Sequence, residues 1–137
     1  MKQKSNLKYE IVKSIAALLN SRGGILVIGY DKTNQQIVGV DIDYQLLKEN
    51  QNWDGWQLAF RQLLLNNFKR NQEIISRLRV IPILKESKTI VKVEVPASDG
   101  QVFVGENDDF YIRYLNSTEK LLPKQIIEYS KIRWKDI

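Results

Sequence analysis

The sequence contains neither cysteine nor histidine among its 137 residues. Without cysteine there are no disulfides and no thiol chemistry, and without either residue a Cys/His zinc site is excluded. Catalytic triads that use histidine are excluded for the same reason. Any catalysis would depend on carboxylates, lysine, tyrosine, serine or threonine, with magnesium as the kind of hard cation such groups bind.

Long apolar runs are also missing, so the sequence predicts no membrane-spanning helix. The first residues lead into no apolar signal core, and we therefore expect a cytoplasmic protein without an export signal. A hydrophobic fraction of 43% and a charged fraction of 27% are typical of a globular chain. The length predicts a single domain over residues 1–137.

Two phosphate-binding motifs are absent. The chain has no G-x-x-x-x-G-K-[ST] loop, and no strand is followed by G-x-G-x-x-G. Nucleotide binding of those two kinds is therefore not indicated.

Charge is unevenly distributed along the chain, whose formal net charge is +5. Residues 1–24, 61–92 and 111–137 are basic, whereas residues 25–60 and 93–110 are acidic. This segregation favours an anionic partner such as nucleic acid if the basic segments share one face. The alternative is a solvated surface on which the charges cluster by chance.

Apolar spacing and turn residues predict the secondary structure. We expect helices at residues 7–20, 41–48, 54–68 and from Pro123 onward, and strands at 25–28, 36–40, 78–84, 89–95, 102–104 and 110–114. This order predicts an α+β fold, with a mixed, mostly antiparallel sheet and helices packed on it. Trp53 and Trp56 belong to the core of the third helix or, alternatively, form stacking platforms for bases.

The centre of the prediction is the branched run Ile25–Ile28, which reads as a buried central strand. Gly23 and Gly24 precede it as a sharp turn after the first helix, and residues 36–40 are expected to complete a hairpin with it. The two glycines either serve turn geometry alone or let a phosphate approach beside Arg22.

Three segments carry a resemblance to a known family. Residues 15–31, IAALLNSRGGILVIGYD, followed by IVG at 37–39, resemble the I-A-A-F-x-N-x-x-G-G-x-L-x-I-G-V-D-D…I-x-G core of the Schlafen AlbA-like domain. FYIRYLNST at 110–118 is similar to its F-Y-x-R-x-x-N-S-T segment, and LPKQIIEY at 122–129 to its last helix. The resemblance spans roughly residues 7–134 and implies a Schlafen/AlbA-like lobe that binds nucleic acid.

The nuclease chemistry of animal Schlafen proteins is not implied in full. Their three acidic residues include two in an E-x-x-x-x-E-F-K stretch before the first helix, which this chain lacks. The third is the second aspartate of G-V-D-D, where this chain has Lys32, so only Asp31 remains. Because metal-assisted cleavage needs clustered carboxylates, we expect binding without this chemistry and predict no metal or cofactor.

The candidate nucleic-acid contacts combine cations with polar turn residues. Arginine offers a planar fork for phosphate, while hydroxyl and amide groups add positioning contacts. Tyr111 is a candidate for base stacking, with packing as its alternative, and residues 116–118 also fit plain turn chemistry. The full set is Arg22, Lys32, Tyr111, Arg113, Asn116, Ser117, Thr118 and Lys120.

Three hypotheses follow from these observations. The first is a cytoplasmic nucleic-acid-binding module, with RNA favoured over DNA, acting as a homodimer that recreates the two lobes of the animal proteins. The second is a magnesium-dependent ribonuclease that uses Asp31 with Asp41 and Asp43. The third is a protein-interaction or regulatory domain in which the basic segments are incidental.

Overall fold

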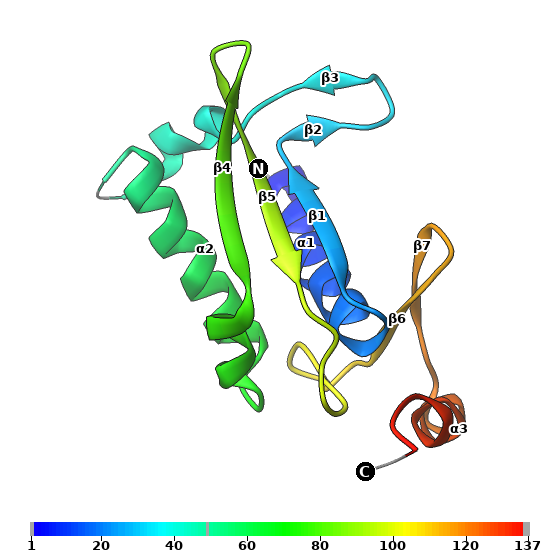
Figure 1. Cartoon of the computed structure of the whole chain (residues 1–137). Helices are drawn as coiled ribbons and strands as arrows, with labels where there is room; N and C mark the ends of the chain where they lie inside the picture. Colours follow the sequence, from blue (N-terminus) through cyan, green and yellow to red (C-terminus); the bar gives the residue numbers. More distant parts are fainter. Residues whose placement is uncertain (1, 49, 136–137) are drawn as a thin grey trace.

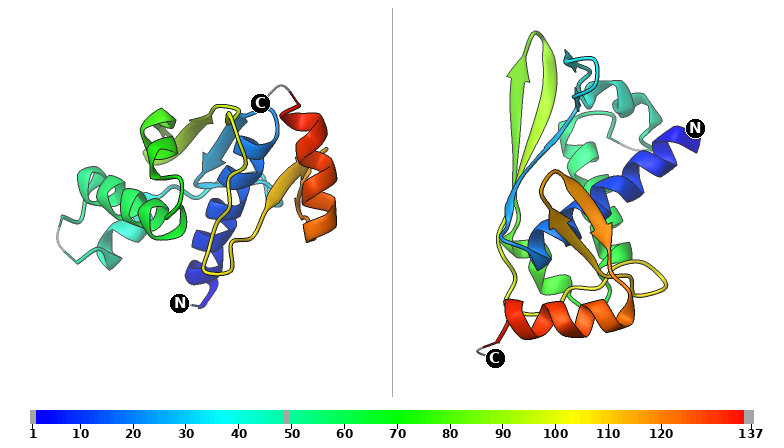
Figure 2. Two further views of the ribbon diagram at one scale, coloured as in Figure 1. Left: turned by 90° about the horizontal axis from the view of Figure 1, so that it is seen from below. Right: turned by 90° about the vertical axis from the view of Figure 1, so that its right-hand side faces the viewer.

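A computed structural model describes residues 2–48 and 50–135, and it has an α+β architecture. One face of a three-stranded sheet is covered by two helices, and a separate hairpin lies beside the first of them (Figure 1). The last helix lies across the end of the molecule, close to where the first helix ends (Figure 2). Among the described helices, none combines the length and apolar character needed to traverse a lipid bilayer.

The elements follow one another along the chain, and the longest connection, residues 96–110, lies between β5 and β6. In order they are α1 (Lys2–Asn20), β1 (Gly24–Ile28), β2 (Tyr30–Asp31), β3 (Gln36–Ile37), η1 (Asp41–Leu46), α2 (Trp53–Asn67), η2 (Gln72–Arg77), β4 (Arg79–Lys85), β5 (Lys88–Val95), β6 (Tyr111–Tyr114), β7 (Ser117–Lys120) and α3 (Pro123–Arg133). All named strand pairs are antiparallel. The predicted strand at 102–104 is reduced to one bridge between Val104 and Asp109.

The sheet has the order β1-β5-β4, which corrects the prediction for β1. The central strand is β5, whose Val91, Val93 and Val95 are buried in alternation as the pattern of a half-covered strand requires. Strand β1 lies at an edge, with Ile25 58% and Val27 49% exposed. Helices cover only one face of the sheet, so the other face of β1 stays open although its residues are apolar (Figure 1).

The predicted hairpin between residues 25–28 and 36–40 does not form. Strand β1 pairs with β5, and the short strand β2 pairs with β3 instead. The chain changes direction at Gly29, whose φ of +97° suits glycine. By contrast, the β4–β5 hairpin forms as expected, with Pro82 in an edge strand, where a missing N–H is tolerated.

Helix α2 supplies the second layer of the core. Asn52 caps it, because its side chain accepts a hydrogen bond from the Gly55 N–H at 3.0 Å. Trp56, Phe60 and Leu64 are buried, and Trp53 stacks on Trp56 with ring centroids 5.4 Å apart. The tryptophans therefore belong to the core, as the first of the two alternatives stated.

Helix α3 buries little of its surface. None of its described residues is fully buried, and Ile127 is 57% exposed. Its attachment is aromatic instead. Tyr129 and Trp134 meet Phe110 edge-on, with ring centroids 6.1 Å and 6.3 Å from it.

Asn20, at the end of α1, is a buried polar residue whose side chain hydrogen-bonds to β6 and to the segment before it. Its side-chain amide donates to the carbonyl oxygens of Val102 and Tyr111 at 2.9 Å and 3.0 Å. Its side-chain oxygen accepts the Val102 N–H at 2.9 Å. Because Asn20 is fully shielded from solvent, its polar side-chain atoms need partners within the protein. The three bonds supply them and join β6 and the segment before it to α1.

We therefore expect Asn20→Ala to destabilise the fold strongly. The substitution leaves an N–H and two carbonyl groups buried without partners, at about 1–3 kcal/mol each when unrelieved, so a loss of about 3 kcal/mol is expected. Urea unfolding monitored by circular dichroism measures this loss. Asn66→Ala, on the exposed side of α2, is the control and should change the free energy of unfolding by less than about 0.5 kcal/mol. Equal effects of the two substitutions would contradict the role of Asn20.

Candidate nucleic-acid interface

The turn after α1 is shaped by backbone packing. The Gly23 N–H donates to the Leu18 carbonyl at 2.8 Å, and Gly23 has a φ of +73°, as in a glycine C-cap. A Cβ at Gly23 would lie 2.5 Å from the Val95 carbonyl oxygen. The glycine therefore allows the β5 backbone to come close, and Arg22 projects from this turn as an exposed residue.

The β6–β7 hairpin carries most of the other candidates. Arg113 lies directly opposite Thr118, so the two side chains share one face of the hairpin. Arg113 Nη1 donates to Thr118 Oγ1 at 3.2 Å, which holds the guanidinium against the sheet surface. The Arg113 backbone N–H donates to Ser21 Oγ at 2.8 Å. This bond joins β6 to the turn that presents Arg22.

The two arginines differ in how they are held. Arg113 is half-buried and oriented by Thr118, whereas the Arg22 side chain has no hydrogen bond or ion pair within the described part of the chain. Lys120, opposite Tyr111, pairs with Asp109 at 3.3 Å while its own side chain is 56% exposed. Arg22 and Arg113 thus form the centre of the candidate interface, and Lys120 extends it along β7.

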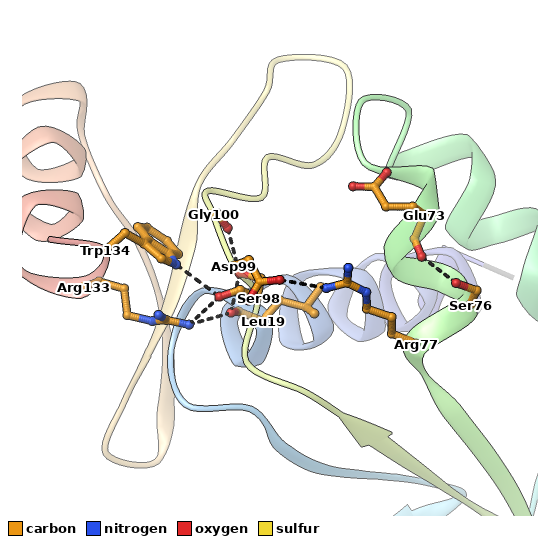
Figure 3. Close-up of polar contacts among 9 residues, drawn as sticks. All are labelled: Leu19, Glu73, Ser76, Arg77, Ser98, Asp99, Gly100, Arg133 and Trp134. Atoms are coloured by element: carbon orange, nitrogen blue, oxygen red, sulfur yellow. Dashed lines mark hydrogen bonds and ion pairs between the residues drawn. The ribbon is translucent and has the colours of Figure 1, made fainter. Parts of the chain in front are cut away.

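A third arginine reaches the same turn, and the sequence reasoning missed it. Arg133 Nε donates to the Ser21 carbonyl at 2.8 Å, and its Nη2 donates to the Ser98 carbonyl at 3.0 Å. Figure 3 shows Arg133 and Trp134 converging on Ser98 and Leu19. The position of Arg133 in the last turn of the predicted helix is a sign of such a role, because cations in a last turn often bond nearby carbonyls. The sequence could not show that these carbonyls belong to the turn after α1 and to the loop after β5.

The comparisons with known proteins decide the family. The family model described as Schlafen, AlbA_2 matches residues 1–122 of this chain. The chain belongs to this family.

One solved structure shows the fold. The crystal structure of the DIP2311 protein from Corynebacterium diphtheriae matches 92% of this chain with a TM-score of 0.60 and 16% sequence identity. The match covers 22% of that protein's chain, so the present chain corresponds to less than a quarter of its length. No curated protein matches the sequence significantly.

Tyr111 takes the packing alternative. It is only 7% exposed and belongs to the core cluster, and its hydroxyl lies 3.5 Å from the Tyr9 hydroxyl. Burial, with the contact to Tyr9, raises the pKa of the Tyr111 phenol. Its ring is therefore covered, which corrects its candidacy as a stacking platform.

The residues at the hairpin tip show turn chemistry. Ser117 Oγ is bonded within the hairpin, to the Tyr114 carbonyl at 3.1 Å and to Glu119 Oε2 at 2.8 Å. Asn116 is exposed at the tip, where the preceding Leu115 has a φ of +56°. Ser117 and Thr118 are part of β7, so the predicted turn is shorter than residues 116–118.

The remaining cation candidate lies elsewhere. Lys32 is exposed in the β2–β3 turn. This turn projects from the molecule and is separate from the β6–β7 hairpin (Figure 1). Asp31 organises this turn, because its carboxylate accepts hydrogen bonds from Asn34 Nδ2 at 2.8 Å and from the Thr33 N–H at 3.0 Å. The bonds from Asn34 lower the pKa of Asp31.

The carboxylates considered for a ribonuclease are not gathered into one site. Asp41 accepts the Thr89 N–H at 2.6 Å and the Thr89 hydroxyl at 2.8 Å, which fastens η1 to β5. In residues 2–48 and 50–135 no group of three or more acidic, histidine or cysteine side chains is placed to hold a metal ion. Asp31 and Asp41 thus each accept hydrogen bonds that hold the neighbouring backbone in place.

We predict that Asp41 contributes to stability in a pH-dependent way. Partial burial alone would raise its pKa, but the two bonds from Thr89 outweigh burial and lower the pKa below 3.8. A carboxyl whose pKa is lower in the folded state stabilises the fold above its unfolded pKa, and this contribution is lost as the pH falls through both values.

Asp41→Asn should therefore cost about 1–2 kcal/mol at pH 7, discounted for solvent screening at a partly exposed site. The difference from the unsubstituted protein should shrink as the pH falls below about 4. Thermal or urea unfolding across pH 3–7 measures it. Asp99→Asn is the control, since that side chain is 91% exposed in its single ion pair. A pH-independent difference for Asp41→Asn would contradict the prediction.

Proposed function

We propose that this domain binds nucleic acid, with RNA favoured over DNA, through the surface formed by Arg22, Arg113 and Lys120. The observation that supports the proposal is the bond from the Arg113 N–H to Ser21 Oγ, which joins the strand that carries Arg113 to the residue that precedes Arg22. Membership of the Schlafen AlbA_2 family supports a nucleic-acid-related role.

The chemistry of this surface suits phosphate more than base edges. Arginine forks bind phosphate oxygens in pairs, and Thr118 already orients the Arg113 fork. Tyr111, the aromatic candidate on the same hairpin face, is buried, so contacts to the backbone dominate over stacking. Such binding depends on structure and charge more than on sequence, and it weakens with salt as counterions are released.

The preference for RNA, the cytoplasmic location and a homodimer complete the proposal. They follow from the resemblance to animal Schlafen proteins, in which two lobes line one basic core. Two copies would present two Arg22–Arg113 surfaces to one folded RNA, and this raises affinity by effective concentration.

We expect a short structured RNA to bind with a strong salt dependence, more tightly than a DNA duplex of the same sequence. Arg22→Ala and Arg113→Ala should each weaken binding by roughly fivefold, about 1 kcal/mol, and reduce the salt slope by about 1. Fluorescence anisotropy at several salt concentrations measures both quantities. Magnesium is present, and the probe is examined on a gel afterwards.

Arg61→Ala is the matched control, because Arg61 is an exposed arginine of α2, a helix that lies on the opposite side of the molecule from β6 and β7 (Figure 1). Its affinity should stay within about twofold of the unsubstituted protein. Binding that ignores salt, or that weakens equally in all three variants, would refute this interface. Cleavage of the RNA would favour the ribonuclease hypothesis over the hypothesis of binding alone.

A further inference from the structure

Ser21, in the turn after α1, is connected to three arginines, two of which come from distant parts of the chain. Its carbonyl oxygen accepts the Arg133 Nε–H at 2.8 Å, and its hydroxyl oxygen accepts the Arg113 backbone N–H at 2.8 Å. Arg22 is the next residue along the chain. Helix α3 therefore ends against the turn that belongs to the proposed interface, which agrees with its position close to the end of α1 (Figure 2).

The half-buried guanidinium of Arg133 is held by uncharged groups. Nε also donates to the Asn20 carbonyl at 3.2 Å, and Nη2 donates to the Ser98 carbonyl at 3.0 Å (Figure 3). The guanidinium lies over the Trp134 ring, with Cζ 4.6 Å from the ring centroid. These bonds use Nε and Nη2, and within the described part of the chain the two N–H groups of Nη1 have no acceptor. The cation is thus fixed in direction and still has two donors to offer.

No carboxylate compensates the charge of Arg133 within residues 2–48 and 50–135. Arg70, Arg77 and Arg79 each pair with an acidic side chain, at 3.0 Å, 3.3 Å and 3.2 Å. By contrast, in the described part of the chain none of the three arginines connected to Ser21 has an acidic partner. Carbonyl dipoles orient a guanidinium but leave it a full positive charge, so uncompensated charge is concentrated at this turn, as binding of phosphate requires.

We propose that Arg133 is a further phosphate contact of this interface, and that Nη1 donates to a phosphate oxygen of the RNA backbone while Nε and Nη2 keep their bonds to carbonyl groups. This role rests on the proposed function and extends its surface to α3, a helix that begins after the family match ends at residue 122. Because the carbonyl groups and Trp134 already fix the guanidinium, binding costs it less side-chain entropy than it costs the unbonded side chain of Arg22.

The alternative is that Arg133 only fastens α3 to the end of α1. The two roles need different properties of the side chain. Fastening needs the planar fork that reaches several carbonyl groups, whereas a phosphate contact also needs the positive charge. Lysine keeps the charge without the fork, and glutamine keeps neither, so the two substitutions remove the same bonds and differ in charge. A purely structural role therefore predicts the same behaviour for both variants.

The salt dependence of RNA binding tests the contact, measured by fluorescence anisotropy with a short structured RNA. Arg133→Gln should reduce the salt slope by about 1 and weaken binding by roughly tenfold, more than Arg22→Ala does. Arg133→Lys should keep the salt slope of the unsubstituted protein. Both variants should unfold at a lower temperature by a similar amount, because both lose the bonds to the carbonyl groups. Circular dichroism establishes the temperature at which each variant is folded, and binding is measured there.

Arg77→Gln is the matched control. Arg77 and Arg133 lie on opposite sides of Ser98 and Asp99, and Arg77 pairs with Asp99 at 3.3 Å (Figure 3). Because this charge is already compensated, its removal should leave the salt slope unchanged. An unchanged slope for Arg133→Gln, or equal reductions of the slope in the glutamine and lysine variants at position 133, would overturn the proposed contact.

A measurement on the unsubstituted protein decides the question if neither variant at position 133 folds. In ¹H–¹⁵N NMR spectra, addition of the RNA should shift the Nε–H signal of Arg133 and leave that of Arg77 in place. An unshifted Arg133 signal in the RNA-bound protein would overturn the contact. The function is judged separately: an unsubstituted protein that binds no RNA refutes the proposed function. Salt slopes that fall in Arg22→Ala and Arg113→Ala but not in Arg133→Gln refute only the contact from Arg133.

Discussion

The carboxyl end of α1 leaves its last carbonyl groups without partners inside the helix, and the rest of the fold is fastened to them. The Ser98 N–H and hydroxyl donate to the Leu19 carbonyl, and the Tyr129 hydroxyl donates to the Asn20 carbonyl at 2.6 Å. Arg133 bonds the same turn, while the Asn20 side chain holds β6. Three segments far apart in sequence, the loop at Ser98, β6 and α3, thus depend on one helix end.

This convergence also shapes the electrostatics of the proposed interface. The carboxyl end of a helix carries partial negative charge, which would repel a phosphate. Here Arg133 donates to those carbonyl groups, while the Arg113 N–H bonds Ser21 Oγ next to Arg22. The guanidinium of Arg133 therefore offsets the partial negative charge of the helix end, which the proposed binding of phosphate requires. Stability and binding are linked in this region, because the bond that places Arg113 is also part of the attachment of β6.

The candidate site could be predicted in part. Arg22 and Arg113 were identifiable from charge and from the resemblance, and the structure places them next to the same serine. Tyr111 could not be judged, because a strand pattern says which residues share a face and not which face α1 covers. Arg133 was missed since its partners are backbone carbonyls far away in the chain, 35 positions for Ser98 and 112 for Ser21, which no local pattern reveals.

The sequence by itself determined the local elements: the amphipathic α1, the glycine cap at Gly23, the β4–β5 hairpin and the tryptophan-bearing α2. These depend on spacing and turn chemistry within a few residues, which a sequence displays directly. Only the tertiary structure decided that β1 is an edge strand. An apolar run such as Ile25–Ile28 shows that both faces favour burial, but which strand pairs with it and what covers it depend on β5 and the helices, contacts made across the whole chain.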